Sequence, residues 1–197
     1  RDWSSDVCSS DLRIAVLGSG GVGKTCLILR LTRATFDPEY IPTIQDYFDK
    51  ELTLDGKEYT LKIIDTAGQD EMQGITDIGI KDSQAAVILY SVTSQLSFNE
   101  AEKYRDKVLQ FSTDNKAKIV LVGNKCDMEP ERVVPFAKGQ ELAKQWGCPF
   151  FETSAKKDIN VTSAFEAALK LLVSENKDEE KDQRSEERRV GKECRSR

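Results

Sequence analysis

The octapeptide GSGGVGKT, residues 18–25, constrains this chain more than any other segment. It directly follows an apolar run that ends at Leu17 and precedes a helical pattern, which is the strand-loop-helix context of a phosphate-binding P-loop. Its four glycines free the backbone to curl, so that successive N–H groups and a helix N-terminus point at one phosphate chain. The pattern therefore predicts a site for a phosphorylated nucleotide.

Two side chains of this segment supply what a nucleoside triphosphate needs. Lys24 offers a mobile positive charge for the outer phosphates, and the Thr25 hydroxyl is a hard oxygen ligand for the accompanying Mg²⁺. A glycine-rich turn between a strand and a helix is the alternative, which the complete G-x-x-x-x-G-K-[ST] pattern disfavours. We assign phosphate binding to Gly18, Gly20, Gly21, Val22, Gly23, Lys24, Thr25 and Cys26.

Length and composition favour one soluble globular domain. The 197 residues suffice for a real core without disulfides or structural metal, and 39% of them are hydrophobic. A net charge of -5 with scattered basic residues argues against a nucleic-acid partner, because binding a phosphate backbone needs a basic stripe. Cys26, Cys126 and Cys148 are singly placed, as expected for reduced thiols in a cytosolic chain. No apolar stretch approaches the length of a transmembrane helix.

Both ends of the chain differ from the domain between them. Cys8–Leu12 can be encoded by a nucleotide string whose reverse complement encodes Arg184–Glu187, and the wider flanks resemble translated sequencing-library adapter. We therefore expect residues 1–12 and 184–197 to be non-native, and exclude them from the fold. A native acidic tail with a chance match is the alternative. Residues 175–183 are charged and unpatterned, which predicts a flexible tail after a single domain at residues 13–174.

Within the domain, short β-type runs alternate with amphipathic helical segments, which is typical of an α/β sheet with crossover helices. Asp55-Gly56 is a tight-turn dipeptide and predicts one antiparallel hairpin. Apolar residues at helical spacing predict a helix over Asn160–Ser174 whose stripe packs on the core. Six strands are expected, at Arg13–Leu17, Asp49–Leu54, Tyr59–Asp65, Ala85–Tyr90, Lys118–Gly123 and Pro149–Thr153.

The segment Asp65–Gln69 follows one of these strands and reaches the sheet edge where open α/β folds bind ligands. Asp65 can hold Mg²⁺ through water, and the Gly68 N–H lies where a terminal phosphate would be sensed. The Gln69 amide can orient an attacking water, which makes it a candidate catalytic residue together with Lys24. An ordinary strand-end turn is the alternative, and the accompanying P-loop disfavours it.

Asn124–Asp127 follows another strand and reaches the same edge. The Asp127 carboxylate can accept two N–H hydrogen bonds from guanine, whereas adenine would leave it unpaired at a cost of about 1–3 kcal/mol or more. Lys125 can lie along the base plane, and Asn124 can brace the loop. The TSA segment that begins at Thr153 is weak evidence by itself. We assign binding of the other side of the base to Ser154, Ala155 and Lys156.

In this order and spacing, the motifs resemble those of small GTPases of the Ras superfamily over residue 13 to about 174. The resemblance implies a three-layer P-loop NTPase fold: a six-stranded, mostly parallel sheet with one antiparallel strand and helices on both faces. It implies GTP or GDP with Mg²⁺ as cofactors. By the same resemblance, Thr43 completes the Mg²⁺ shell and contacts the γ-phosphate, Phe36 packs against guanine, and Tyr40 covers the phosphates.

The segment YIPTIQDYF resembles the effector loop of the Ras and Rap branch more than those of the Rho, Rab or Arf types. GSGGVGKT is similar to Rap in particular, whereas Gln69 follows Ras and Gln45 replaces the usual glutamate. The segment DEMQGITDIGI, residues 70–80, departs further from the family pattern, because Met72, Thr76 and Gly79 stand where tyrosine, arginine and tyrosine are expected. These changes bear on recognition by exchange factors and activating proteins and leave the nucleotide motifs intact.

The resemblance implies a molecular switch that binds effectors in its GTP state and loses their surface on hydrolysis. No arginine lies between Phe36 and Ile44, so we expect slow hydrolysis that needs an arginine supplied by an activating protein, with an exchange factor as the other regulator. A GTP-bound recruitment module with negligible hydrolysis is the alternative, against which Gln69 and Gly20 argue. An ATP-using kinase with the same P-loop is a third reading, against which Asn124–Asp127 counts.

We expect a cytoplasmic monomer. Proteins of the Ras branch usually end in a prenylation signal, and Cys194–Arg197 does not form a convincing C-a-a-X box. It also lies within the adapter-like flank. A lipid anchor on a native C-terminus that is lost from this sequence would place the protein at the cytoplasmic face of a membrane.

Overall fold

The computed structural model describes residues 12–36, 45–66, 68, 73–112 and 118–174. Within these ranges, six strands form one sheet in the order β2-β3-β1-β4-β5-β6. All neighbours run parallel except the antiparallel pair β2 and β3. The predicted sheet, mostly parallel with one antiparallel strand, is confirmed. The strands are β1 (Leu12–Leu17), β2 (Gln45–Leu54), β3 (Lys57–Thr66), β4 (Ala85–Ser91), β5 (Ile119–Asn124) and β6 (Phe150–Thr153).

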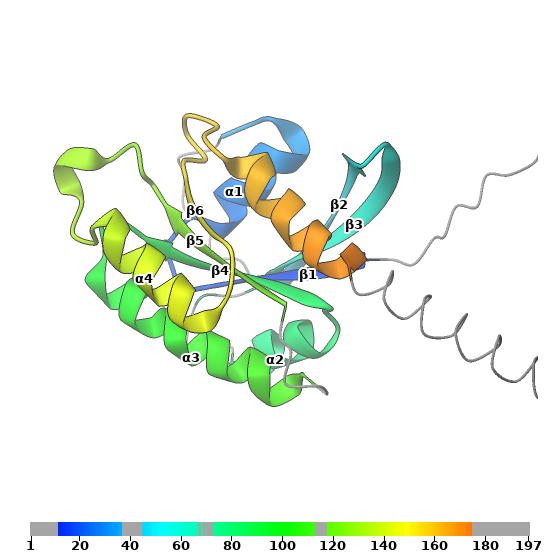
Figure 1. The fold of residues 1–197 in the computed structure, drawn as a ribbon, viewed down its shortest axis with the longest axis horizontal. Coiled ribbons are helices and arrows are strands. Elements are labelled where there is room, and N and C mark those ends of the chain that lie inside the picture. The colour runs from blue at the N-terminus through cyan, green and yellow to red at the C-terminus, as the bar shows by residue number, and fades with distance from the viewer. Residues whose placement is uncertain (1–11, 37–44, 67, 69–72, 113–117, 175–197) are drawn as a thin grey trace, which may run out of the picture.

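Helices cover both faces of the sheet. Figure 1 shows α2, α3 and α4 on one face, and α1 with the final helix, coloured orange and described over residues 161–174, on the other. The chain therefore has the expected three layers. The named helices are α1 (Lys24–Arg33), α2 (Gln73–Lys81), α3 (Gln95–Phe111) and α4 (Phe136–Trp146), and the short 3-10 helix η2 spans Glu129–Glu131.

The central strands are largely apolar because both of their faces are buried. In β1, Ile14 and Val16 join the core under α1, whereas Ala15 and Leu17 join the core under α2 and α3. Successive side chains of a strand point to opposite faces, so one apolar run serves two hydrophobic cores. All seven residues of β4 are buried for the same reason.

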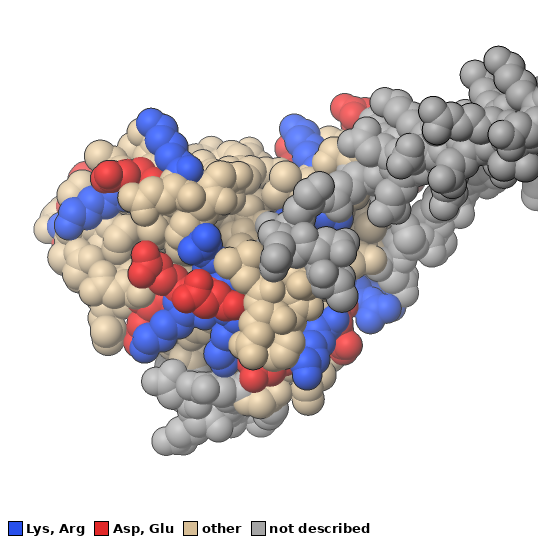
Figure 2. Space-filling view, turned by 60° about the horizontal axis from the view of Figure 1, so that its bottom comes forward, with Lys and Arg blue, Asp and Glu red and all other residues tan. Residues whose placement is uncertain are grey.

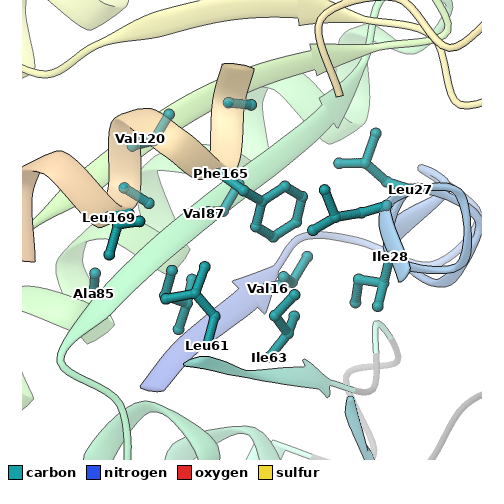
Figure 3. Packing of buried hydrophobic residues seen from close by; sticks show 14 of the residues in the cluster. Val16, Leu27, Ile28, Leu61, Ile63, Ala85, Val87, Val120, Phe165 and Leu169 are labelled. Carbon is teal, nitrogen blue, oxygen red and sulfur yellow. The ribbon is translucent and has the colours of Figure 1, made fainter. Parts of the chain in front are cut away.

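The final helix packs its apolar stripe on the sheet, as its helical spacing predicts. Figure 3 shows Phe165 of this helix beside Val87 of β4 and directed toward Leu27 of α1, while Leu169 lies on the side of Ala85. Phe165 and Leu169 are fully buried, and each such side chain stabilises the fold by roughly 1.5–3 kcal/mol. The stripe is therefore core packing.

The hairpin between β2 and β3 turns at Asp55 and Gly56, whose φ angles are 53° and 78°. Positive φ at both central residues is the geometry of a tight two-residue hairpin turn. However, β2 begins at Gln45, four residues before the predicted start. Pairing with β3 from Gln45 opposite Thr66 onward sustains this edge strand, although its side chains show no clear apolar alternation.

The other strand bounds differ from the prediction by one or two residues. β1 begins at Leu12, the last residue of the predicted adapter-like flank; Leu12 is buried and lies opposite Leu61 of β3. Burial against β3 recruits this leucine into the strand whatever its origin. Residues 1–11 and 175–197 lie outside the described residues, so the origin of the flanks and the flexible tail stay predictions.

Candidate functional site

The motifs singled out in the sequence come together at one edge of the sheet. The P-loop follows β1, Gly68 follows β3, Asn124 ends β5, and Ser154 directly follows β6. Parallel strands bring their carboxyl ends to the same edge, where open α/β sheets bind their ligands. The fold therefore assembles one site from four separate segments.

Backbone conformation shapes the P-loop. Gly18, Gly21 and Gly23 have φ angles of 145°, 75° and 95°, which residues other than glycine rarely adopt. A methyl group at Gly18 would also come within 2.3 Å of the Leu89 carbonyl oxygen. Gly23 is the N-cap of α1, so the N-terminus of α1, the end of a helix that favours anions, lies where the P-loop ends.

Lys24 is the candidate cation for binding phosphate. Its ammonium donates hydrogen bonds to the carbonyl oxygens of Gly18, at 2.8 Å, and Ser19, at 2.9 Å. Burial lowers the pKa of Lys24 from its usual 10.5 to about 8, and the charge of the Asp65 carboxylate partly opposes this shift. A lysine desolvated in this way is a strong partner for phosphate oxygens.

Thr25 and Asp65 form an oxygen cluster beside Lys24. The Thr25 hydroxyl donates to Asp65 Oδ2 at 2.6 Å, and Asp65 is fully buried. A hydroxyl and a carboxylate are hard oxygen donors, which fit Mg²⁺ held by few protein ligands together with phosphate oxygens and water. The described ranges hold no group of three or more His, Cys, Asp or Glu residues placed to hold a metal ion.

The segment after β5 is hydrogen-bonded directly to the P-loop. Asn124 Nδ2 donates to the Val22 carbonyl oxygen at 2.9 Å, and Lys125 Nζ donates to the Gly21 carbonyl oxygen at 2.8 Å. The other end of the Asn124 amide accepts from the Thr153 hydroxyl at 3.2 Å. Asn124 therefore holds three segments of the site in fixed relative positions.

Asp127 and the loop after β6 face each other. The Ser154 hydroxyl donates to Asp127 Oδ1 at 2.6 Å and accepts from the Lys157 N–H at 3.0 Å. An isolated bridge between Ser154 and Ile159 closes the loop that carries Ala155 and Lys156. Ala155 is buried and Lys156 is exposed. The loop thus presents its backbone beside a carboxylate oriented by a hydroxyl.

Sequence reasoning missed Arg30. Its Nε donates to the Ala155 carbonyl oxygen at 2.7 Å, and its two terminal nitrogens donate to the carbonyl oxygens of Lys156 and Ala34, at 3.3 and 2.9 Å. Arg30 thereby ties the end of α1 to the loop after β6. No local pattern could have revealed this role, because Ala155 lies 125 residues away in the chain.

The remaining candidates divide into two groups. Phe36 is half-buried and packs, like Cys26, against the core cluster under α1. A methyl group at Gly68 would come within 2.5 Å of Lys24 Nζ and 2.6 Å of the Gly20 nitrogen, so Gly68 lies directly against the P-loop. Three candidates lie outside the described residues, namely Tyr40, Thr43 and Gln69.

The molecular surface shows no dominant basic patch on the face drawn in Figure 2, where blue and red side chains lie side by side. Among the residues that the structure describes, none of the helices combines the length and apolar character needed to cross a bilayer.

The chain also matches the model of a known protein family. The model of the family described as the Ras family matches residues 13–174, from the second residue of β1 to the end of the described final helix. The match spans every candidate site residue, including those outside the described ranges.

Proposed function

Since the chain belongs to the Ras family, we propose that it is a GTP-binding and GTP-hydrolysing molecular switch of the Ras and Rap type. Family membership makes the chain a small GTPase, a class that binds guanine nucleotide and works with regulators and effectors. The observation that carries the proposal is the hydrogen bond from Asn124 to the Val22 carbonyl oxygen, at 2.9 Å. It joins a phosphate-binding loop to a base-reading loop in one site.

Guanine selectivity rests on Asp127. Its carboxylate accepts from N1 and the 2-amino group of guanine, whereas adenine has no 2-amino donor and offers an acceptor at N1. The 2.6 Å hydrogen bond from Ser154 holds the carboxylate in one orientation. Preorganisation of this kind lowers the cost of ordering the loop when the base binds.

The phosphates bind at the other end of the site. Lys24 neutralises negative charge on the outer phosphates, while Thr25, together with Asp65 through water, would hold Mg²⁺, which would shield the phosphate oxygens. The short distance of 2.6 Å between Thr25 Oγ1 and Asp65 Oδ2 supports a shared role for these two oxygens. The N-terminus of α1 adds N–H donors for the same charge.

Hydrolysis and switching depend on groups that respond to the γ-phosphate. In this proposal the Gly68 N–H and Thr43 contact the γ-phosphate, and the Gln69 amide orients the attacking water. The two loops that carry them lose these contacts on hydrolysis, so effectors bind only the GTP state. Without an arginine between Phe36 and Ile44, intrinsic turnover is slow and an activating protein supplies the missing cation.

Competition between GTP and ATP tests the proposed base recognition. Purified full-length chain should prefer GTP by about 100-fold or more, and Asp127→Asn should remove most of that preference, because the new amide places a donor where guanine needs an acceptor. Asp82→Asn, which changes an exposed carboxylate at the end of α2, is the matched control and should keep the preference. A preference for ATP in the unmodified chain would refute the proposed GTP switch and favour an ATP-using enzyme.

Single-turnover hydrolysis separates a switch from a static binding module. The isolated chain should convert bound GTP to GDP slowly, and an arginine-donating activator of the Ras family should accelerate the conversion by about 10³–10⁵-fold. GTP that survives prolonged incubation with every such activator would favour a recruitment module. Fast turnover by the isolated chain would instead refute the dependence on an activator.

A further inference from the structure

Ser19 is the point where the P-loop contacts helix α3. The Ser19 hydroxyl donates a hydrogen bond to the Glu100 carboxylate, which lies 81 residues further along the chain. Both residues are half-buried. The nucleotide motifs leave the second position of GSGGVGKT unassigned, so this contact has no place in the site described above.

The carbonyl group of Ser19 belongs to the phosphate site itself. It accepts from Lys24 Nζ at 2.9 Å, next to the Gly18 carbonyl oxygen. A methyl group at Gly68 would come within 2.7 Å of the Ser19 carbonyl carbon and 2.6 Å of the Gly20 nitrogen. The Ser19–Gly20 peptide is therefore packed between the lysine that meets the phosphates and the backbone that follows β3.

Helix α3 presents Glu100 from a fixed position. The Ser94 side chain caps α3 by accepting from the Ser97 N–H at 3.3 Å, and the Ser97 hydroxyl accepts from the Ser91 N–H of β4 at 3.0 Å. Ser97 is buried, so these contacts hold the first turns of α3 on the sheet. Glu100 lies one turn after Ser97, which limits the movement of its backbone.

The same helix also contacts α2. Lys107 Nζ donates to Asp77 Oδ1 at 3.0 Å. Lys107 follows Glu100 by seven residues, which is about two helical turns and returns to the same face of α3. One helix face therefore contacts the P-loop and the helix that follows Gly68.

We propose that Glu100 is a positioning residue of the phosphate site, which sets the Ser19–Gly20 peptide against Lys24 and Gly68 through the Ser19 hydroxyl. The inference rests on the proposed function, since the site must hold guanine nucleotide for this position to matter. Without the hydrogen bond, the Ser19 carbonyl is freer to move, and Lys24 loses part of the frame that aims its ammonium at the phosphates.

A double-mutant cycle on the full chain tests the proposal. Ser19→Ala and Glu100→Ala should each raise the dissociation rate of fluorescently labelled GDP by about five-fold, as expected for one partly exposed hydrogen bond to a charged group. The double variant should match either single variant, because both remove the same contact. Glu100→Gln keeps an acceptor for the Ser19 hydroxyl and should stay within about two-fold of the unmodified chain.

The matched control is Glu102→Ala, which removes an exposed carboxylate from the same helix and should leave the dissociation rate unchanged. Melting temperature is recorded for every variant, since a purely structural contact would lower it and leave GDP release unaltered. That result, additive effects of Ser19→Ala and Glu100→Ala, or a Glu100→Gln variant as impaired as Glu100→Ala would overturn the proposal. Absence of guanine-nucleotide binding by the unmodified chain would overturn the proposed function as well, and is visible before any variant is made.

Discussion

The two ends of the candidate site differ in what shapes them: backbone conformation at the phosphate end and side-chain hydrogen bonds at the base end. At the phosphate end, glycine backbone does most of the shaping, with Gly18 at a φ of 145° and Gly23 at 95°. At the base end, side chains do it: Asn124 donates to the Val22 carbonyl oxygen, and Ser154 donates to Asp127. The difference predicts that added atoms harm the phosphate end most, whereas removed polar atoms harm the base end.

This contrast follows from what each end has to recognise. A phosphate chain is a compact anion that several N–H groups and one ammonium can surround, so the loop must lack side chains that would keep the backbone away. A base is read by directional hydrogen bonds along one edge, so the groups that meet it must be held at fixed angles.

Substitution of Gly18 tests the backbone side of the comparison and should have the largest effect. In Gly18→Ala, the methyl group would lie 2.3 Å from the Leu89 carbonyl oxygen, which is rigid strand backbone. We expect loss of measurable GDP binding and about 3 kcal/mol or more of lost stability in chemical unfolding. Gly21→Ala is the matched variant: its φ of 75° is strained, yet a methyl group there meets no atom within 4 Å, so it should cost only about 1–2 kcal/mol. Equal losses in the two variants would show that φ alone, and not close approach, decides the loop.

Removal of the Asn124 amide tests the side-chain side of the comparison. Asn124→Ala leaves the buried Thr153 hydroxyl without its acceptor and unties the Val22 carbonyl oxygen, at a cost of about 1–3 kcal/mol for each group. Affinity for GDP should fall by about 100-fold in equilibrium binding. Asn124→Asp retains the acceptor for Thr153 but not the donor to Val22, so its affinity for GDP should lie between those of the unmodified chain and Asn124→Ala. An Asn124→Ala variant with unchanged affinity would mean that the P-loop holds its shape without the base end.

The pKa of Lys24 makes the phosphate end sensitive to pH. Because burial lowers this pKa from 10.5 to about 8, Lys24 loses its proton in the ligand-free protein as the pH rises through 8. The unfolded chain keeps that proton up to about pH 10.5, so Lys24 favours the folded state increasingly between pH 8 and 10.5, and the full cost of burying its charge is present below pH 8.

Nucleotide binding should show the opposite trend, since phosphate charge favours the protonated lysine. Affinity for GDP should fall above pH 8, by at most about ten-fold per pH unit. Isothermal calorimetry from pH 7 to pH 9.5 measures this slope. Lys24→Arg keeps its charge throughout and should remove the slope, so the same slope in that variant would assign the effect to another group.

Arg30 should produce the smallest of these effects. Arg30→Ala frees the Ala155 and Lys156 carbonyl oxygens and loosens the loop after β6, which should raise the GDP dissociation rate by about five-fold. Arg33→Ala is the matched control on the next turn of α1, because its guanidinium lies over the Phe48 ring and not against that loop. Dissociation that is unchanged in Arg30→Ala would show that the bridge of Ser154 to Ile159 holds the loop by itself.

Local sequence signals predicted the fold well where burial and pattern coincide. The central strands and the final helix agree within one or two residues, because apolar periodicity reports directly which faces are buried. The predicted start of β2 is wrong by four residues. This edge strand is held by hydrogen bonds to β3 and needs no apolar alternation of its own. Such pairing is invisible in a single segment.

The candidate site divides in the same way. Short motifs single out Lys24, Thr25, Asp65, Asn124 and Asp127 as candidates, because phosphate, metal and base chemistry each demand particular groups at fixed local spacing. The structure brings these residues to one edge of the sheet, and their binding roles stay predictions. The roles proposed for Tyr40, Thr43 and Gln69 stay predictions, since these residues lie outside the described ranges. The sequence did not predict the contacts of Arg30 and Glu100, because each residue is hydrogen-bonded to a segment more than 80 residues away.

The sequence by itself determined which chemical groups are candidates to bind a guanine nucleotide and in what order the strands and helices that carry them occur. Only the tertiary structure decided how these groups support one another: that Asn124 holds the P-loop, that Arg30 holds the loop after β6, and that α3 reaches Ser19. The physical reason is range. A motif is a local arrangement of covalently neighbouring residues, whereas bracing contacts form between segments that meet only when the sheet orders its strands side by side.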